Sequence, residues 1–376
     1  MDQNKTILFF NTNKSWGGGE KWHLEMAKAF VKKNYVVHVF AHKDGELLKR
    51  SQQENIPVTP VNVGKLSFLN PVKIQSVARK VKDINPWVII LNLPSDMKAG
   101  GLAARKAGVP NIFYRRGTAL PVKAHWINRY FFQHILTGVI ANSHKTKELI
   151  NKNHLLIAKE RIHVIYNGIE HIPELSKKEP AGNFIIGNAG RMVAQKGQDY
   201  LIELGKSLAD DMEDFQIHIA GDGPLKDELQ ASIKKHNLSE KIQLTGFHTD
   251  LSDFYQSLDV FILPSRWEGF GYVMAEAMLH QIPVIAFNIS SNPELIKNGN
   301  TGFLCPMGDI QKLKEKVLYL KDNPHKREEM GKNARVWALR NFTMEKSVQA
   351  LEKVIVSFGL ILIWQVYRTV KMWVLK

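Results

Sequence analysis

Two glutamates that are eight residues apart, Glu268 and Glu276, stand out as side chains that could do chemistry. They lie in the segment 264–278, which joins the end of a predicted strand to a predicted helix. Glu276 falls inside that helix among apolar neighbours, where a carboxylate needs a hydrogen-bond partner because burying it alone is costly. The hydroxyls of a ribose would serve, as they do for acidic residues in other α/β nucleotide sites. Glu268 precedes the helix, where backbone N–H groups are free, and either glutamate alone could equally be a solvated or capping carboxylate.

Two cations, Arg191 and Lys196, lie five residues apart on another predicted strand-to-helix loop, 190–197. Arginine offers a fixed planar charge and lysine a mobile point charge, a combination that suits a diphosphate. Cys305 is the one cysteine of the chain, which excludes an intrachain disulfide and a cysteine-cluster metal site. The residues show no convincing metal cluster, so no metal and no cofactor are expected.

Glycines occur at two further strand-to-helix junctions. The segment 15–20 contains Gly17 and Gly18, which would let backbone N–H groups approach an anion at a helix N-terminus. A plain flexible turn is the alternative, and neither the dinucleotide fingerprint nor the P-loop pattern is present. The segment 220–224 contains Gly221 and Gly223, for which a structural turn and a ligand contact are both open interpretations.

Short apolar strands alternate with amphipathic helices on both sides of these loops, which favours parallel sheets with crossover helices. The sequence therefore predicts an α/β protein of two doubly wound, Rossmann-like domains facing across a cleft, with ligands at the carboxyl ends of the strands. The strands are expected at 7–10, 36–41, 88–91, 112–114, 139–141 and 164–166, and then at 184–189, 215–220, 241–245, 260–263, 284–286 and 302–305. The helices are expected at 19–33, at 144–151 with Asn142 or Ser143 as the cap, and at 197–209, 223–236, 249–257, 271–280, 292–297 and 309–321.

A polar stretch at 171–183 has the composition of a linker. We expect an N-terminal acceptor domain over 1–178, a C-terminal donor domain over 179–345, and a crossover helix with a tail over 346–376. The first apolar run is too short for a signal peptide, and no run is long enough to span a bilayer, so the expected location is cytoplasmic. The apolar tail after residue 354 could pack on the first domain or lie on a membrane surface as a monotopic contact.

The positive charge is confined to one half of the chain. Lysine and arginine exceed aspartate and glutamate by 51 − 36 = 15, and residues 1–180 alone hold 28 basic and 13 acidic side chains, which leaves the second half neutral. A basic half suggests an anionic partner, such as nucleic acid, acidic lipid or an anionic substrate. No nucleic-acid recognition motif is present, and nucleic-acid binding leaves the glutamate pair unexplained.

In combination, these segments resemble the family 4 glycosyltransferases of the GT-B fold over residues 5–345. The matching features are the Glu268–Glu276 pair as an E-x7-E motif, Gly190 and Arg191 with Lys196 and Gly197, residues 221–224, Thr245 to Phe247, Pro264 and Ser265, and in the first half 141–143 and 164–169. The resemblance implies that a sugar moves from a nucleotide-diphosphate donor to an acceptor with retention of configuration and without a metal. A nucleotide-sugar epimerase on the same fold is the rival enzyme class.

The resemblance also implies roles for particular residues. Arg191 and Lys196 would hold the donor diphosphate and stabilise it as it leaves, and Glu268 would orient the donor sugar. Glu276 would accept hydrogen bonds from the ribose. The remaining donor contacts would come from Gly17, Gly18, Gly190, Gly221, Gly223, Phe247, Phe270 and Gly271. Closure of the domains would belong to this mechanism.

The sequence departs from the family where many relatives carry a histidine that contacts the donor sugar. Arg115 and Arg116 stand there instead, as candidate ligands of the donor sugar or of an anionic acceptor, or as plain surface charges. Residues 121–136 mix aromatic and basic side chains, which suits a core-packed helix or an interfacial helix on an acidic membrane. The expected partners are a nucleotide sugar, based on UDP or GDP, and a glycan or lipid-linked acceptor of cell-surface polysaccharide or lipopolysaccharide synthesis. The sequence does not specify the base, the sugar, the acceptor or the oligomeric state.

Overall fold

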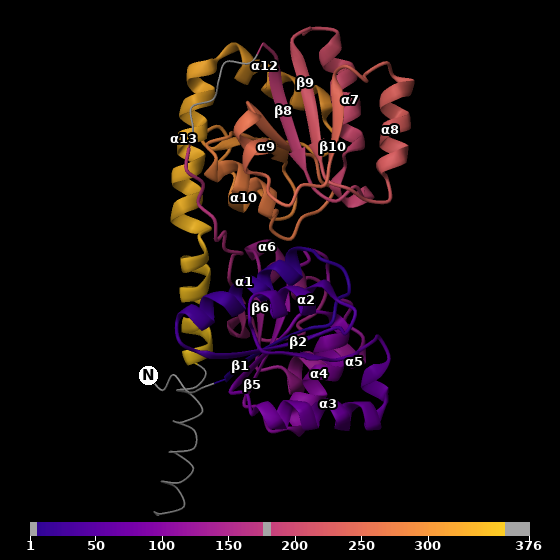
Figure 1. Ribbon diagram of the computed structural model, residues 1–376, viewed down its shortest axis with the longest axis vertical. Coiled ribbons are helices and arrows are strands. Elements are labelled where there is room, and N and C mark those ends of the chain that lie inside the picture. Colours follow the sequence, from indigo (N-terminus) through magenta and orange to yellow (C-terminus); the bar gives the residue numbers. More distant parts are fainter. Residues whose placement is uncertain (1–5, 176–181, 358–376) are drawn as a thin grey trace, which may run out of the picture. The chain divides into compact units, whose positions relative to one another are not determined.

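The computed structural model describes residues 6–175 and 182–357, which form two compact units. Within the described residues, the first unit comprises 6–170 and 344–357, and the second comprises 171–175 and 182–343. Each unit is built around one parallel sheet with helices on its faces (Figure 1). The predicted α/β class with two Rossmann-like domains is therefore confirmed. The predicted boundary between residues 178 and 179 lies outside the described residues.

Seven parallel strands form the sheet of the first unit, in the order β3-β2-β1-β4-β5-β6-β7. The strand order reverses between β1 and β4, which is the doubly wound arrangement. Both faces of such a sheet are covered, so the central strands are apolar along their whole length. The strands are β1 Thr6–Asn11, β2 Val36–Ala41, β3 Val58–Pro60, β4 Val88–Leu91, β5 Asn111–Arg116, β6 Gly138–Ala141 and β7 Ile162–Val164.

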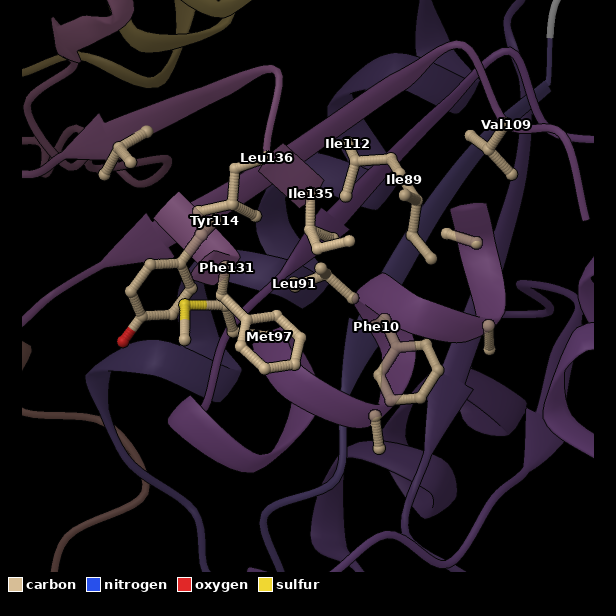
Figure 2. Close-up of a cluster of buried hydrophobic side chains, with 14 of the residues drawn as sticks. Phe10, Ile89, Leu91, Met97, Val109, Ile112, Tyr114, Phe131, Ile135 and Leu136 are labelled. Carbon is tan, nitrogen blue, oxygen red and sulfur yellow. The ribbon is translucent and has the colours of Figure 1, made fainter. Parts of the chain in front are cut away.

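Successive side chains of β1 enter two different hydrophobic clusters, because side chains alternate between the faces of a strand. Phe10 packs with Leu91, Met97 and Phe131 in one cluster (Figure 2). Phe9 belongs to the cluster on the other face, where its ring meets that of Trp22. The helical segments that cover the sheet are α1 Gly18–Lys32, α2 Glu46–Gln53, η1 Ser67–Leu69, α3 Pro71–Ile84, α4 Pro94–Lys106, α5 Trp126–Tyr130, η2 Phe131–Ile135, α6 His144–Ile150 and η3 Lys159–Arg161.

The helix 344–357 packs on the first unit, far in sequence from the strands that it covers. Leu351 and Ile355 are fully buried in the same cluster as Phe9. Glu352 pairs with Lys33 and accepts a 2.8 Å hydrogen bond from the Tyr35 hydroxyl. This helix therefore completes the core of the first unit. The sequence left packing or membrane contact open for the apolar tail after residue 354. Its residues 355–357 belong to this helix, where Ile355 packs on the first unit, and the remainder lies outside the described residues.

Six parallel strands form the sheet of the second unit, in the order β10-β9-β8-β11-β12-β13. The order reverses between β8 and β11, so ligands are expected beyond the carboxyl ends of these two strands. The strands are β8 Phe184–Ala189, β9 Phe215–Ala220, β10 Ile242–Gly246, β11 Val260–Leu263, β12 Val284–Phe287 and β13 Gly302–Cys305. The helical segments are η4 Ala194–Lys196, α7 Asp199–Ala209, α8 Lys226–Lys235, α9 Ser252–Ser257, α10 Tyr272–Leu279, α11 Asn292–Leu295, α12 Ile310–Asp322 and α13 Pro324–Asn341.

The observed helices and strands differ from the predicted ones mainly in the first unit. The strand predicted at 164–166 is displaced, since β7 ends at Val164, and β3 was not predicted. Residues 121–136 do not form one core helix: α5 continues as the π-helical segment η2, and Trp126 is 78% exposed while Phe131 is buried. The cap of α6 is Ser143, whose hydroxyl accepts from the backbone N–H of Thr146. Across the described residues, every helix is too short or too polar to cross a bilayer.

Candidate active site

Three loops of the second unit meet at the carboxyl edge of its sheet. They follow β8, β9 and β11, which are neighbouring strands, so parallel pairing brings their ends together. The first two loops are joined by backbone hydrogen bonds, from Gly190 N–H to the Ala220 carbonyl at 2.9 Å and from Met192 N–H to the Asp222 carbonyl at 2.9 Å. The sequence motifs at 190–197, 221–224 and 264–271 thus form one continuous surface.

Gly221 is required by this close approach of two loops. Its φ is +134°, and a Cβ built there would lie 2.0 Å from the Gly190 carbonyl oxygen. Gly223 is restricted in the same way by the Met192 carbonyl oxygen, at 2.5 Å. Backbone packing therefore accounts for both glycines, as the structural-turn interpretation expected. Their contact with a donor stays a prediction.

Lys196 and Glu268 form an ion pair across the loops after β8 and β11. The Lys196 ammonium lies 2.6 Å from Glu268 Oε1, and the Ser265 hydroxyl donates to the same oxygen at 2.7 Å. The Glu268 side chain is 5% exposed and that of Lys196 is 19% exposed, so the pair is shielded but opens toward solvent on the lysine side. A lysine ammonium has three donors, and one of them is used by Glu268. The arrangement fixes a positive charge at the sheet edge.

Arg191 lies on the same loop and is exposed. Its backbone carbonyl accepts a 3.4 Å hydrogen bond from the buried Gln198 amide, which helps to hold the loop. The backbone also joins this loop to the one after β11, through the Arg266 N–H and the Gln195 carbonyl at 2.8 Å. The structure thus keeps the two predicted diphosphate ligands, Arg191 and Lys196, on one rigidly supported loop.

Glu276 projects from α10 toward a buried tyrosine that the sequence reasoning missed. The Tyr255 hydroxyl donates to Glu276 Oε2 at 3.1 Å, and Tyr255 is 1% exposed. Burial raises the pKa of Tyr255, and the Glu276 carboxylate raises it further. Glu276 itself is half-buried, with the positive-φ Gly271 at the N-cap of its helix. A tyrosine from α9 therefore supplies a hydrogen-bond partner for this carboxylate.

The two phenylalanines predicted to contact the donor lie in different surroundings. Phe247 is 69% exposed, which leaves its ring accessible to a ligand. Phe270 is 2% exposed, and its ring packs against those of Tyr272 and Phe342 in the interior of the unit. Phe270 therefore supports the loop in this structure, and its donor contact stays a prediction.

The glycine loop of the first unit lies above a buried polar network. Gly17 caps α1 and is exposed together with Gly18. Beneath them Glu20, only 3% exposed, accepts hydrogen bonds from the side-chain amides of Asn11 at 3.0 Å and Asn92 at 3.5 Å. The acidic residue thus belongs to the interior of the loop rather than to its surface.

Arg115 completes this network, and the interpretation of Arg115 as a surface charge is wrong. It is 2% exposed, donates to Asn92 Oδ1 at 3.3 Å and to Asn167 Oδ1 at 3.0 Å, and its guanidinium lies 4.6 Å from the centre of the Trp22 ring. The neighbouring His23 is fully buried, and desolvation, with the charge of Arg115, lowers its pKa to about 3. Arg116 is half-buried and donates to the Leu120 carbonyl at 2.6 Å.

The sequence prediction gave no role to several residues of both sites, namely Glu20, Asn92, Asn167, Tyr255 and Ser265, although Asn167 and Ser265 lie in segments that matched the family. Some signals were available: Glu20 follows three glycines, and Asn92 follows a buried strand directly. No signal marked Tyr255, since it looks like any apolar residue of a helix. Among the described residues, no three His, Cys, Asp or Glu side chains are grouped as metal ligands.

We expect Arg115→Lys to lower the free energy of unfolding by about 1–3 kcal/mol, since an ammonium does not reproduce the forked guanidinium contacts to Asn92 and Asn167 and the buried Asn167 oxygen loses its donor. Arg116→Lys is the matched control, with an expected change of about 0.5 kcal/mol because its site is partly exposed. Denaturant unfolding measures both variants. Equal stability of the two variants would contradict the buried network.

Family models match both units of the chain. Residues 16–171 match the model described as Glycosyltransferase Family 4, and residues 172–337 match Glycosyl transferases group 1. An uncharacterised glycosyltransferase of Methanocaldococcus jannaschii is 33% identical over 261 residues, which is 68% of this chain and 70% of that protein. The UDP-Gal:α-D-GlcNAc-diphosphoundecaprenol α-1,3-galactosyltransferase of Escherichia coli is 28% identical over 278 residues, or 67% of this chain and 70% of that protein.

The fold has solved counterparts as well. The crystal structure of Anabaena HepE in complex with UDP is 25% identical to this chain, with a TM-score of 0.82, and the similarity covers 94% of this chain and all of that one. This similarity, together with the two parallel-sheet units, assigns a two-domain α/β architecture to the chain. The chain therefore belongs to the family 4 glycosyltransferases and has the GT-B fold.

Proposed function

We propose that this protein is a retaining, metal-independent glycosyltransferase that moves a sugar from a UDP-sugar to a glycan or lipid-linked acceptor in cell-surface polysaccharide synthesis. The observation that carries the proposal is the Lys196–Glu268 pair, held at the edge of the sheet with Arg191 on the same loop. The UDP bound in the HepE structure supports the choice of nucleotide. The acceptor of the E. coli relative supports a lipid-linked glycan.

Arg191 and Lys196 have the chemistry to stabilise the leaving nucleotide. When the bond between the sugar and the diphosphate breaks, negative charge develops on the phosphate oxygens. Preorganised cations near that position lower the barrier, since they need no reorganisation as the charge appears. Glu268 and Ser265 hold the Lys196 ammonium in place for this role. In the proposed mechanism these side chains supply the charge that a metal supplies in other phosphate sites.

Glu276 is proposed to bind the nucleoside rather than the sugar. A carboxylate is an acceptor only, so it pairs well with the two hydroxyls of a ribose. The hydrogen bond from Tyr255 fixes one oxygen of that carboxylate before the nucleotide arrives. Phe247, exposed after β10, is placed by the sequence on the loop proposed to contact the base. Glu268, next to the Lys196 ammonium, is proposed to orient the sugar.

The test is a thermal-shift screen of UDP, GDP and ADP with their sugars, in buffer that contains EDTA. A UDP-sugar at about a hundredfold excess over its Kd is expected to stabilise the protein by about 2.7 kcal/mol through mass action. Transfer to a diphosphoundecaprenol-linked glycan with the same donor, followed by NMR of the anomeric proton, then reports the configuration. Formation of an epimeric sugar product without any acceptor would indicate an epimerase. An inverted product would contradict retention, and activity restored only by a divalent cation would contradict metal independence.

A further inference from the structure

Among the exposed large apolar side chains of the first unit, five lie in two short segments, 66–72 and 126–130. Leu66, Leu69 and Val72 are 70%, 66% and 77% exposed, and Trp126 and Tyr130 are 78% and 47% exposed. Single exposed apolar residues are common on soluble proteins, but a contiguous group marks an interaction site.

Packing beneath the surface joins the two segments. The Phe68 ring of η1 meets the Phe131 ring of η2 with centroids 6.1 Å apart, and Phe131 in turn meets the Tyr130 ring at 5.7 Å. Both η1 and η2 also pack on α4, beside α3 and α5 in the same unit (Figure 1). Trp126 and Tyr130 are four residues apart and share one face of α5. We call Leu66, Leu69, Val72, Trp126 and Tyr130 the apolar ridge.

The charged side chains near the apolar ridge in the sequence are all cations. The segments 55–82 and 97–147 contain no aspartate or glutamate, although they contain many lysines and arginines. Lys65, Lys123 and Arg129 are exposed close to the ridge residues, and Lys73 is half-buried one residue after Val72. Lys65, Leu66 and Lys73 also line a shallow hollow. Four cations, Lys65, Lys73, Lys123 and Arg129, thus lie close in sequence to the exposed apolar side chains.

We propose that the apolar ridge and its cations dock the first unit on the surface of an anionic lipid bilayer. Tryptophan and tyrosine prefer the level of the headgroups, aliphatic side chains enter the acyl boundary, and lysine and arginine bind anionic headgroups. A nucleic acid would explain the positive charge, and a protein partner would explain the exposed apolar side chains. An anionic bilayer explains both features together. The inference rests on the proposed function in one respect, since a lipid-linked acceptor gives the docking its use.

The experiment is cosedimentation of the full chain, without any nucleotide sugar, with phosphatidylcholine vesicles that contain or lack phosphatidylglycerol. Wild type is expected to bind the anionic vesicles and to be released by high salt, which screens the cations. Leu66→Ser/Leu69→Ser/Val72→Ser and Lys65→Gln/Lys73→Gln/Lys123→Gln are each expected to weaken binding by about tenfold or more. Leu155→Ser/Val336→Ser is the matched control, because these exposed apolar residues lie outside the ridge, and it should bind like wild type.

Three outcomes would overturn the proposal. The first is that wild type does not bind, the second is that it binds neutral and anionic vesicles equally, and the third is that the ridge variants bind like wild type. Loss of binding in Trp364→Ser/Trp373→Ser with unchanged binding of the ridge variants would assign the membrane contact to the tail instead. Thermal unfolding verifies that each variant is folded. Since the assay contains no donor, a protein that fails to bind vesicles but transfers sugar would refute the docking surface and leave the proposed function intact.

Discussion

Lys196→Ala is expected to lower kcat for sugar transfer by about 10²–10³-fold, with a much smaller change in KM for the donor. The ammonium lies 2.6 Å from Glu268 Oε1 and is held on a loop that backbone hydrogen bonds connect to its neighbours. Removal of this charge takes away stabilisation that grows as the diphosphate leaves. A group that acts mainly on the developing charge affects turnover more than ground-state binding.

The control for this variant is Lys206→Ala on α7, an exposed lysine that pairs only with the nearby Glu203 in the contacts described, at 3.0 Å. It should leave kcat unchanged. Glu268→Gln and the double variant Lys196→Ala/Glu268→Gln complete a double-mutant cycle. The kcat of the double variant is expected to be only slightly lower than that of Lys196→Ala, because the two side chains act as a unit. Steady-state kinetics of folded variants measures all of these. If Lys196→Ala retains wild-type kcat, the assignment of the diphosphate site is wrong.

Glu276→Ala is expected to weaken the binding of UDP by about 10- to 150-fold, which corresponds to about 1.5–3 kcal/mol for hydrogen bonds to a charged group. The loss has two sources: the ribose loses its acceptor, and the buried Tyr255 hydroxyl loses the carboxylate to which it donates. Tyr255→Phe is expected to weaken binding less, since the carboxylate remains and loses only one hydrogen bond that positions it.

Titration calorimetry of UDP with the wild type and both variants measures this effect. Glu328→Ala is the control, because Glu328 lies on the surface of α13 and pairs with Lys332 one turn away. An affinity for UDP that is the same in Glu276→Ala and Glu328→Ala would show that Glu276 does not bind the nucleoside. Equal binding of UDP and of ribose diphosphate without the uracil would show that base contacts, including any from the loop of Phe247, add nothing to the affinity.

The alternation of strands and helices could be predicted because it depends on local patterns of apolar residues. The strands 36–41, 88–91, 184–189, 215–220, 260–263 and 302–305 have the predicted bounds. Buried parallel strands are almost wholly apolar, which makes them conspicuous between polar helices. The third strand of the first unit, β3, was missed because it is short, directly follows Pro57 and ends at Pro60, and prolines are typical of turns.

The candidate donor site was also predictable in part. Arg191, Lys196 and Glu268 each follow a buried strand, and the carboxyl ends of neighbouring parallel strands share one edge of a sheet. The sequence could not show that Lys196 pairs with Glu268, because 72 residues separate them and side-chain contacts at that range depend on loop geometry. The same holds for Tyr255, which reaches Glu276 from another helix.

The sequence alone determined the fold class, the glycosyltransferase family and the loops predicted to bind anions, because each of these depends on local residue patterns and spacings. Only the tertiary structure decided which charged and aromatic side chains are buried. It placed Arg115 and Glu20 in the interior, turned Phe270 into a core residue, and left Trp126 in solvent. The physical reason is that the burial of a side chain depends on contacts with segments that are distant in the chain. Arg115 and Arg116 are neighbours in the sequence, yet Arg115 is buried and Arg116 is only half-buried.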